Sequence, residues 1–300
     1  MSRACALVLG LGALGVDISA ARNAAACATC DAGDQTLTVN GAELPFAGRL
    51  RSAFELRRRS DAIGQAGIDR TELVETRLDL TMLWAPGESI SLMAMVPLAH
   101  RRITDASLVE TDTWGVGDVE LRAKWFAFKD RDFAPRVLGA LVGGVRLPVA
   151  PWHHGPSGEL FPLEAQLGAG SVDALLGPSF AVFDGQLSAY LGVLWSEPLR
   201  ARSALEPGRA LRGSLSAQYQ LVPWLGLRAA SDLRWSAPAR ERGQRDPSSG
   251  GWIQLAGGDL LVSVAESTVL LVGLRVPVVD RLAGAHDEGS VASFAILQDW

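Results

Sequence analysis

Hydrophobic and polar residues alternate one by one over long stretches of this chain. Between positions 211 and 221, one set of alternate residues is Leu, Gly, Leu, Ala, Tyr and Leu, and the other is Arg, Ser, Ser, Gln and Gln. Successive side chains of a β-strand point to opposite faces, so this pattern predicts a strand with one apolar face and one polar face.

Three further segments alternate in the same way, near 74–84, 118–125 and 225–235, with charged residues on the polar face. Over the whole chain, alternating segments lie near 48–58, 71–84, 89–99, 117–128, 135–147, 170–182, 186–196, 210–221, 224–235, 252–263, 267–276 and 290–300. The pattern predicts an all-β fold of about twelve strands, each long enough to cross a membrane at a tilt.

The connections between these segments alternate in length. Short turns are expected at 85–88, 129–132, 183–185, 222–223 and 265–266, and long loops at 59–70, 100–116, 148–169, 197–209, 236–251 and 277–289. This order is typical of a transmembrane antiparallel up-and-down β-barrel, whose short turns lie in the periplasm and whose long loops lie outside the cell. A soluble β-sandwich has no reason to keep it.

Aromatic residues cluster beside the short turns, where they predict an interfacial girdle. The alternative is ordinary packing of aromatic side chains in a core. The girdle candidates are Trp84, Phe128, Phe183, Trp224 and Trp300. The terminal aromatic residue also suggests recognition by the outer-membrane assembly machinery, although Gln298 interrupts the apolar face of the last segment.

If the apolar faces meet lipid, the charged faces must line the interior, because a charge at the middle of the lipid face costs about 2–4 kcal/mol. The predicted lumen-lining residues are Arg77, Asp79, Asp118, Glu120, Arg122, Lys124, Arg228, Asp232 and Arg234. Such an interior could be a passage whose charges select solutes. It could equally be filled by mutually satisfied ion pairs, without transport.

The chain has a net charge of -5 at pH 7, which argues against a nucleic-acid partner. The densest basic run, Arg57 to Arg59, lies where a strand meets a loop and is interpreted as a solvated rim. Beyond the N-terminal segment, no apolar run reaches the ~18 residues of a membrane helix.

Residues 1–26 have the features of a secretory signal peptide, with a basic start, an apolar stretch and a small-residue cleavage site. Residues 27–47 would then be a periplasmic leader or a partial plug of the barrel, followed by the barrel itself at 48–300. Cys27 and Cys30 are candidates for a disulfide in an oxidising compartment, and the alternative is a lipid-bearing Cys27.

Enzymatic chemistry has little support in the sequence. The four histidines are His100, His153, His154 and His286, all in or beside predicted outer loops. His286 with Asp287 could form a dyad and His153 with His154 part of a metal site, but neither pair has a recognisable nucleophile or third ligand nearby. We therefore expect no catalytic residues, no metal site and no cofactor.

Three glycine-containing stretches carry a family resemblance: 115–124 (GVGDVELRAK), 144–148 (GVRLP) and 168–178 (GAGSVDALLGP). They resemble strand starts and a strand end in the outer-membrane barrel family named for transport in the phenol-degradation meta-pathway. The resemblance follows strand order over most of the chain and implies transport of small, including aromatic, compounds. It implies no set of substrate-binding residues.

The sequence therefore predicts a barrel in the bacterial outer membrane that passes small hydrophobic or aromatic solutes through a charged lumen. Its expected partners are membrane lipid, the solute and the assembly machinery, with no nucleic acid. One alternative is a structural or surface-interaction barrel without transport, and another is a secreted soluble β-protein.

Overall fold

The computed structural model describes residues 47–65, 68–132, 134–154, 166–201, 205–284 and 286–300. The predicted signal peptide and nearly all of the predicted leader, with Cys27 and Cys30, lie outside the described residues. Within the described part, every element assigned is a strand. No helix in this part of the chain is long and apolar enough to cross a membrane.

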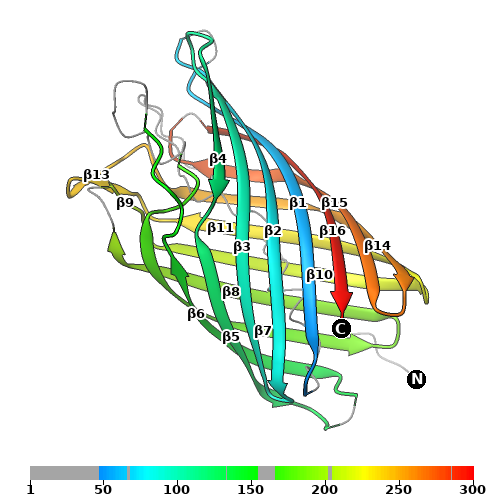
Figure 1. Ribbon diagram of the computed structural model, residues 1–300. Coiled ribbons are helices and arrows are strands. Elements are labelled where there is room, and N and C mark those ends of the chain that lie inside the picture. Colours follow the sequence, from blue (N-terminus) through cyan, green and yellow to red (C-terminus); the bar gives the residue numbers. More distant parts are fainter. Residues whose placement is uncertain (1–46, 66–67, 133, 155–165, 202–204, 285) are drawn as a thin grey trace, which may run out of the picture.

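Twelve long strands close into a barrel, and each is antiparallel to its neighbours (Figure 1). The closing contact joins the first strand to the last, with Arg51 opposite Asp299. In ring order the strands are β1 (Leu50–Ile63), β2 (Thr71–Gly87), β3 (Ile90–Thr104), β5 (Val119–Lys129), β6 (Val137–Leu147), β7 (Ser171–Asp184), β8 (Leu187–Ala201), β10 (Ala210–Val222), β11 (Leu225–Ser236), β14 (Gly251–Ala265), β15 (Thr268–Leu282) and β16 (His286–Asp299). The predicted all-β barrel of about twelve strands is confirmed.

Several strands are longer than predicted, and the largest extensions lie at the end with the long loops. β1 runs on to Ile63, β3 to Thr104 and β15 to Leu282, so the predicted loops 59–70, 100–116 and 277–289 are shorter than expected. These extensions carry polar residues on both faces, so their hydrophobic alternation is weak although their backbones remain paired. Three two-residue strands, β9 (Leu205–Glu206), β12 (Arg240–Glu241) and β13 (Gln244–Arg245), form a small separate sheet among the long loops.

One extra strand, β4 (Glu110–Val116), lies inside a segment predicted as a loop. The half of β3 near the long loops pairs with β4, and the half near the short turns pairs with β5. β4 and β5 are therefore two halves of one bent strand. The bend falls at Gly117, whose amide donates to the Pro97 carbonyl at 2.8 Å. β4 therefore lies beside β3 and continues the barrel wall on the long-loop side (Figure 1).

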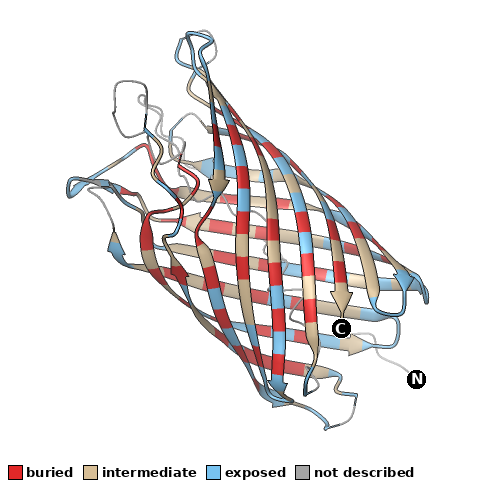
Figure 2. Cartoon of the chain, viewed as in Figure 1, coloured by how far each residue is buried: buried red, intermediate tan, exposed pale blue. Residues whose placement is uncertain are grey.

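Burial alternates along the strands, as the bands of colour in Figure 2 show. On β5, Leu121 and Trp125 are 42% and 53% exposed, whereas Glu120 and Arg122 are 1% and 4% exposed. Charged residues inside and apolar residues outside are the reverse of a soluble sandwich and match a barrel surrounded by hydrocarbon. The chain is a transmembrane barrel of the bacterial outer membrane.

Aromatic residues lie at both ends of the apolar belt. At the short-turn end, Trp84, Phe128, Trp224 and Trp300 are all exposed. At the long-loop end, register places Trp195, Leu211, Trp235, Trp252 and Arg281 in one row across five strands. Ten residues, 225–234, separate Trp224 from Trp235, which agrees with the ~9–11 residues of a tilted membrane strand.

Phe183 lies on the other face of the wall from these girdle residues. Its neighbours Phe180 and Val182 are exposed, whereas Phe183 packs against a buried cluster and makes an edge contact with Tyr190 at 5.9 Å between ring centroids. We predicted Phe183 as a girdle residue because it lies beside a short turn. Alternation along β7 places it inside.

Gly177 marks a close approach between β7 and β8. A Cβ at this position would overlap the carbonyl oxygen of Val193 on β8. The adjacent Pro178 has no amide hydrogen and cannot donate a hydrogen bond to a neighbouring strand.

Replacing Gly177 by alanine is therefore expected to destabilise the barrel by about 1–3 kcal/mol, as overpacking does. Urea unfolding in lipid vesicles would measure this loss, with Gly143→Ala as the matched control. A Cβ at Gly143 meets open space, so equal effects of the two substitutions would contradict the close approach.

Candidate functional site

The charged residues predicted to face the lumen lie at inward positions. Arg77 and Asp79 are on β2, Asp118 directly precedes β5, and the others are on β5 and β11. All are buried apart from Arg77, whose side chain is 14% exposed. Six of them fall into three ion-pair groups, and each group includes partners that were not singled out from the sequence. The six are Arg77, Asp79, Glu120, Arg122, Arg228 and Asp232.

The first group joins β1, β2 and β3. Asp79 accepts from Arg77 Nε at 2.7 Å and from Arg57. Glu75 accepts from Arg59 Nε at 3.2 Å and from Arg101. Arg57 and Arg59 therefore belong to the interior, which corrects their interpretation as a solvated rim. Of that run, Arg58 alone is exposed on the outer face.

The second group is centred on Glu120, whose side chain is 1% exposed. Arg146 Nε on β6 donates to Glu120 Oε1 at 2.8 Å, and Arg122 on β5 also donates to this carboxylate. Arg212 Nη2 on β10 donates to Glu120 Oε1 at 3.2 Å. One carboxylate therefore binds guanidinium groups from three strands.

The contact between Arg212 and Glu120 crosses the barrel interior. In ring order β6, β7 and β8 lie between β5 and β10, so the two side chains meet across the lumen and not along the wall. Arg146 extends the group to β7, because its Nη1 donates to Asp173 Oδ2 at 3.1 Å. These contacts therefore link β10, β5, β6 and β7 through one chain of ion pairs.

The third group lies on β11, β14 and β15. Asp259 Oδ2 accepts from Arg228 Nε at 2.6 Å and from Arg275 Nη2 at 2.7 Å. Arg275 Nε also lies 3.2 Å from Asp232 Oδ2. Alternation places Asp259 and Arg275 on inward faces, so the signal for them was in the sequence. Each is an isolated charge in an otherwise apolar segment.

The described parts of the connection between β6 and β7, residues 148–154 and 166–170, contact Asp118 and Arg101. Asp118 accepts from the amide of Ala169 at 2.6 Å and from the amide of Ala150 at 3.3 Å. Arg101 donates to the carbonyl of Gln166, which is itself buried. Asp118 therefore holds a loop and does not belong to any of the three ion-pair groups.

Apolar residues line the interior near the short-turn end, which the sequence analysis did not expect. One cluster on β5–β8 consists of Phe126, Leu138, Ala140, Ala181 and Tyr190, with Phe183 packed against it. A second on β1, β14, β15 and β16 consists of Ala53, Leu261, Leu271, Ala295 and Leu297. The interior near the short-turn end therefore combines apolar clusters with the ion pairs that Asp299 forms with Arg49 and Arg51.

The four histidines lie towards the long-loop end of the barrel, on β3, on the connection between β6 and β7, and at the start of β16. His100 Nε2 lies 3.1 Å from Asp112 Oδ1 on the exposed face of β3 and β4, where Arg102 Nε contacts the same oxygen. Asp287, the candidate partner of His286, is exposed and contacts Arg70 at 3.8 Å. The described residues contain no group of His, Cys, Asp and Glu suited to a metal ion.

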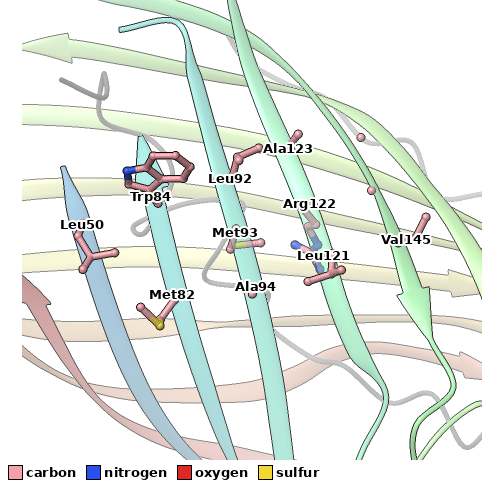
Figure 3. A pocket seen from close by; sticks show the side chains of 12 residues that line it. Leu50, Met82, Trp84, Leu92, Met93, Ala94, Leu121, Arg122, Ala123 and Val145 are labelled. Carbon is pink, nitrogen blue, oxygen red and sulfur yellow. The ribbon is translucent and has the colours of Figure 1, made fainter. Parts of the chain in front are cut away.

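The outer wall has a shallow hollow of about 500 Å³ across β1, β2, β3, β5 and β6 (Figure 3). Large apolar side chains border it, and its base is formed by small residues. In Figure 3, Trp84 and Leu92 extend to one side of the strands, while Arg122 extends to the other. The lining residues are Leu50, Met82, Trp84, Leu92, Met93, Ala94, Leu121, Arg122, Ala123, Gly143, Gly144 and Val145.

No family model and no curated protein matches this sequence. Among solved structures, the COG4313 outer-membrane channel of Pseudomonas putida F1 aligns with a TM-score of 0.65 and 13% identity, over 86% of this chain and 97% of that chain. The chain shares the fold of an outer-membrane channel. At this identity the likeness shows the fold alone.

Two further structures align less closely. They are the translocator domain of the autotransporter NalP from Neisseria meningitidis, with a TM-score of 0.47, 12% identity and coverage of 86% and 91%, and the CymD monoaromatic hydrocarbon channel, with a TM-score of 0.47, 10% identity and coverage of 89% and 93%.

Proposed function

We propose that this barrel passes small hydrophobic or aromatic solutes across the outer membrane, through an interior narrowed by ion pairs, without catalysis or a cofactor. The observation that carries the proposal is the contact between Arg212 and Glu120 across the lumen. Two side chains that meet across a lumen can move apart and open a passage, whereas a packed core cannot open in this way. The nine inward charges predicted from the sequence would then line the passage.

The distribution of polarity favours solutes with apolar surface. The charged side chains are engaged with one another, and separating them permanently would leave buried charges without partners. Near the short-turn end, the two apolar clusters around Phe126 and Leu271 offer aromatic and aliphatic contacts. A solute that needs few hydrogen bonds can use this surface at little desolvation cost.

The solved channel from Pseudomonas putida supports this proposal, because nearly its whole length aligns with the present chain. A transport function needs an interior that opens. If the ion pairs stay closed, they favour the alternative of a structural barrel. A measurement of flux must therefore separate a transporting barrel from a structural one.

Flux into proteoliposomes containing the full mature chain tests the proposal. Benzoate and gluconate are both singly charged anions, but benzoate alone is aromatic. We expect protein-dependent flux of both after subtraction of protein-free liposomes, with benzoate faster. If neither anion shows protein-dependent flux, the structural alternative is favoured. Equal rates would refute the preference for aromatic solutes.

A further inference from the structure

The hollow in the outer wall arises from the order of large and small residues across neighbouring strands. Register places Trp84, Leu92, Ala123 and Gly143 side by side in one outward row. The next row is Met82, Ala94, Leu121 and Val145. Two small residues follow two large ones in the first row, and a small residue lies between large ones in the second. The wall is therefore indented where the small residues lie.

Hydrocarbon is the medium that meets this indentation. The surrounding outward residues are exposed and apolar, including Met82, Leu92 and Leu121 at 55%, 40% and 42%. The hollow begins at Leu50 and Trp84, near the short-turn end of the barrel, and continues along the strands towards Leu121 and Val145. Since short turns face the periplasm, this is the depth of the periplasmic leaflet.

Packing, and not the hydrophobic effect, decides what occupies a lipid-facing hollow, because lipid tails are as apolar as the wall. A chain lying on a smooth wall contacts protein on one side. A chain lying in this hollow is contacted by the base at Ala123 and Gly143 and by the raised borders at Trp84 and Val145. Each added contact at about 4 Å contributes dispersion energy, and an unfilled hollow would lose it.

We propose that this hollow is a binding site for one acyl chain of a phospholipid in the periplasmic leaflet. The hydrocarbon of one leaflet is about 15 Å deep, half of the ~30 Å bilayer core. A chain anchored at the interface beside Trp84 can therefore reach the borders at Leu121 and Val145. The site belongs to the outer wall and does not depend on transport through the lumen.

Substitutions that fill the hollow test this proposal. Ala123→Leu and Gly143→Leu place a large side chain on its base, and a Cβ at Gly143 meets no atom within 4 Å. The matched control is Ala229→Leu, an outward alanine on β11 outside the hollow. Each full-length variant is reconstituted in nanodiscs of phosphatidylethanolamine and phosphatidylglycerol, and native mass spectrometry measures the fraction that keeps one phospholipid.

We expect this fraction to fall about tenfold in Ala123→Leu and Gly143→Leu, equivalent to about 1.4 kcal/mol, and to stay unchanged in Ala229→Leu. Equal retention in all three variants would overturn the proposal. So would a dimer in place of the lipid adduct, because a second copy would then occupy the hollow.

A second measurement leaves the base of the hollow unchanged. Phospholipids brominated along the acyl chain should quench the fluorescence of Trp84, obtained as the difference between the wild type and Trp84→Phe, at least twofold more than that of Trp224, obtained in the same way with Trp224→Phe. Trp224 is exposed at the same short-turn end of the barrel but lies outside the hollow. If bromines placed at the depth of the periplasmic leaflet quench the two residues equally, no chain is held beside Trp84.

Discussion

Replacing Glu120 by alanine is expected to destabilise the barrel by about 3–5 kcal/mol, the cost of removing one partner from a buried ion pair. Glu120 is almost fully buried and accepts from Arg122, Arg146 and Arg212. Without its carboxylate these guanidinium groups remain close together inside the barrel. Urea unfolding in lipid vesicles, followed by tryptophan fluorescence and by heat-modifiable gel mobility, measures the loss.

Glu88 provides the matched control for this experiment. It is exposed in the short turn between β2 and β3, so Glu88→Ala should change the free energy of unfolding by less than about 0.5 kcal/mol. If Glu120→Ala were no more destabilising than Glu88→Ala, the cluster around Glu120 would not hold the interior together.

Replacing Arg212 by alanine is expected to raise the single-channel conductance several-fold. Arg212 provides the contact across the lumen, whereas Arg122 and Arg146 approach Glu120 from the same strand and the adjacent one. Glu120 keeps these two partners in the variant, so the stability loss should be smaller than for Glu120→Ala. Planar-bilayer recordings measure the conductance directly.

The control for the conductance experiment is Arg281→Ala. Arg281 is exposed at the outer end of β15, where its guanidinium lies 5.9 Å from the ring of Trp252. This substitution removes an arginine without touching the interior. An unchanged conductance in Arg212→Ala would mean that the narrowest part of the lumen lies elsewhere.

The sequence was sufficient to predict the fold because the period of two is a local property. Every lipid-facing residue of a strand is two positions from the next, as in Leu211 to Leu221, and the short turns follow at regular intervals. The outer ends of β1 and β3 lacked that signal. Arg57 and Arg59 occupy alternate positions of β1, but Arg58 between them is also charged. We therefore interpreted this part of the strand as a solvated rim beside a loop.

The contacts inside the barrel could not be predicted, because they depend on which strands face one another after closure. Glu120 and Arg212 are 92 positions apart in sequence. Alternation places both inside, but their contact needs the curvature and stagger of the whole barrel. The interior apolar clusters were missed for another reason. In the segment around Leu138 and Ala140 both faces of the strand are apolar, so alternation gives no inward direction there.

Spin-label accessibility at Leu215 and Ser216 tests the polarity of the wall most directly. These adjacent residues of β10 are 56% and 2% exposed. Each would be replaced by a labelled cysteine, in a background without Cys27 and Cys30, and reconstituted in lipid vesicles. The account predicts high accessibility to lipid-soluble oxygen at 215 and low accessibility at 216. Equal accessibility, or the reverse order, would contradict a barrel with hydrocarbon outside and charged groups inside.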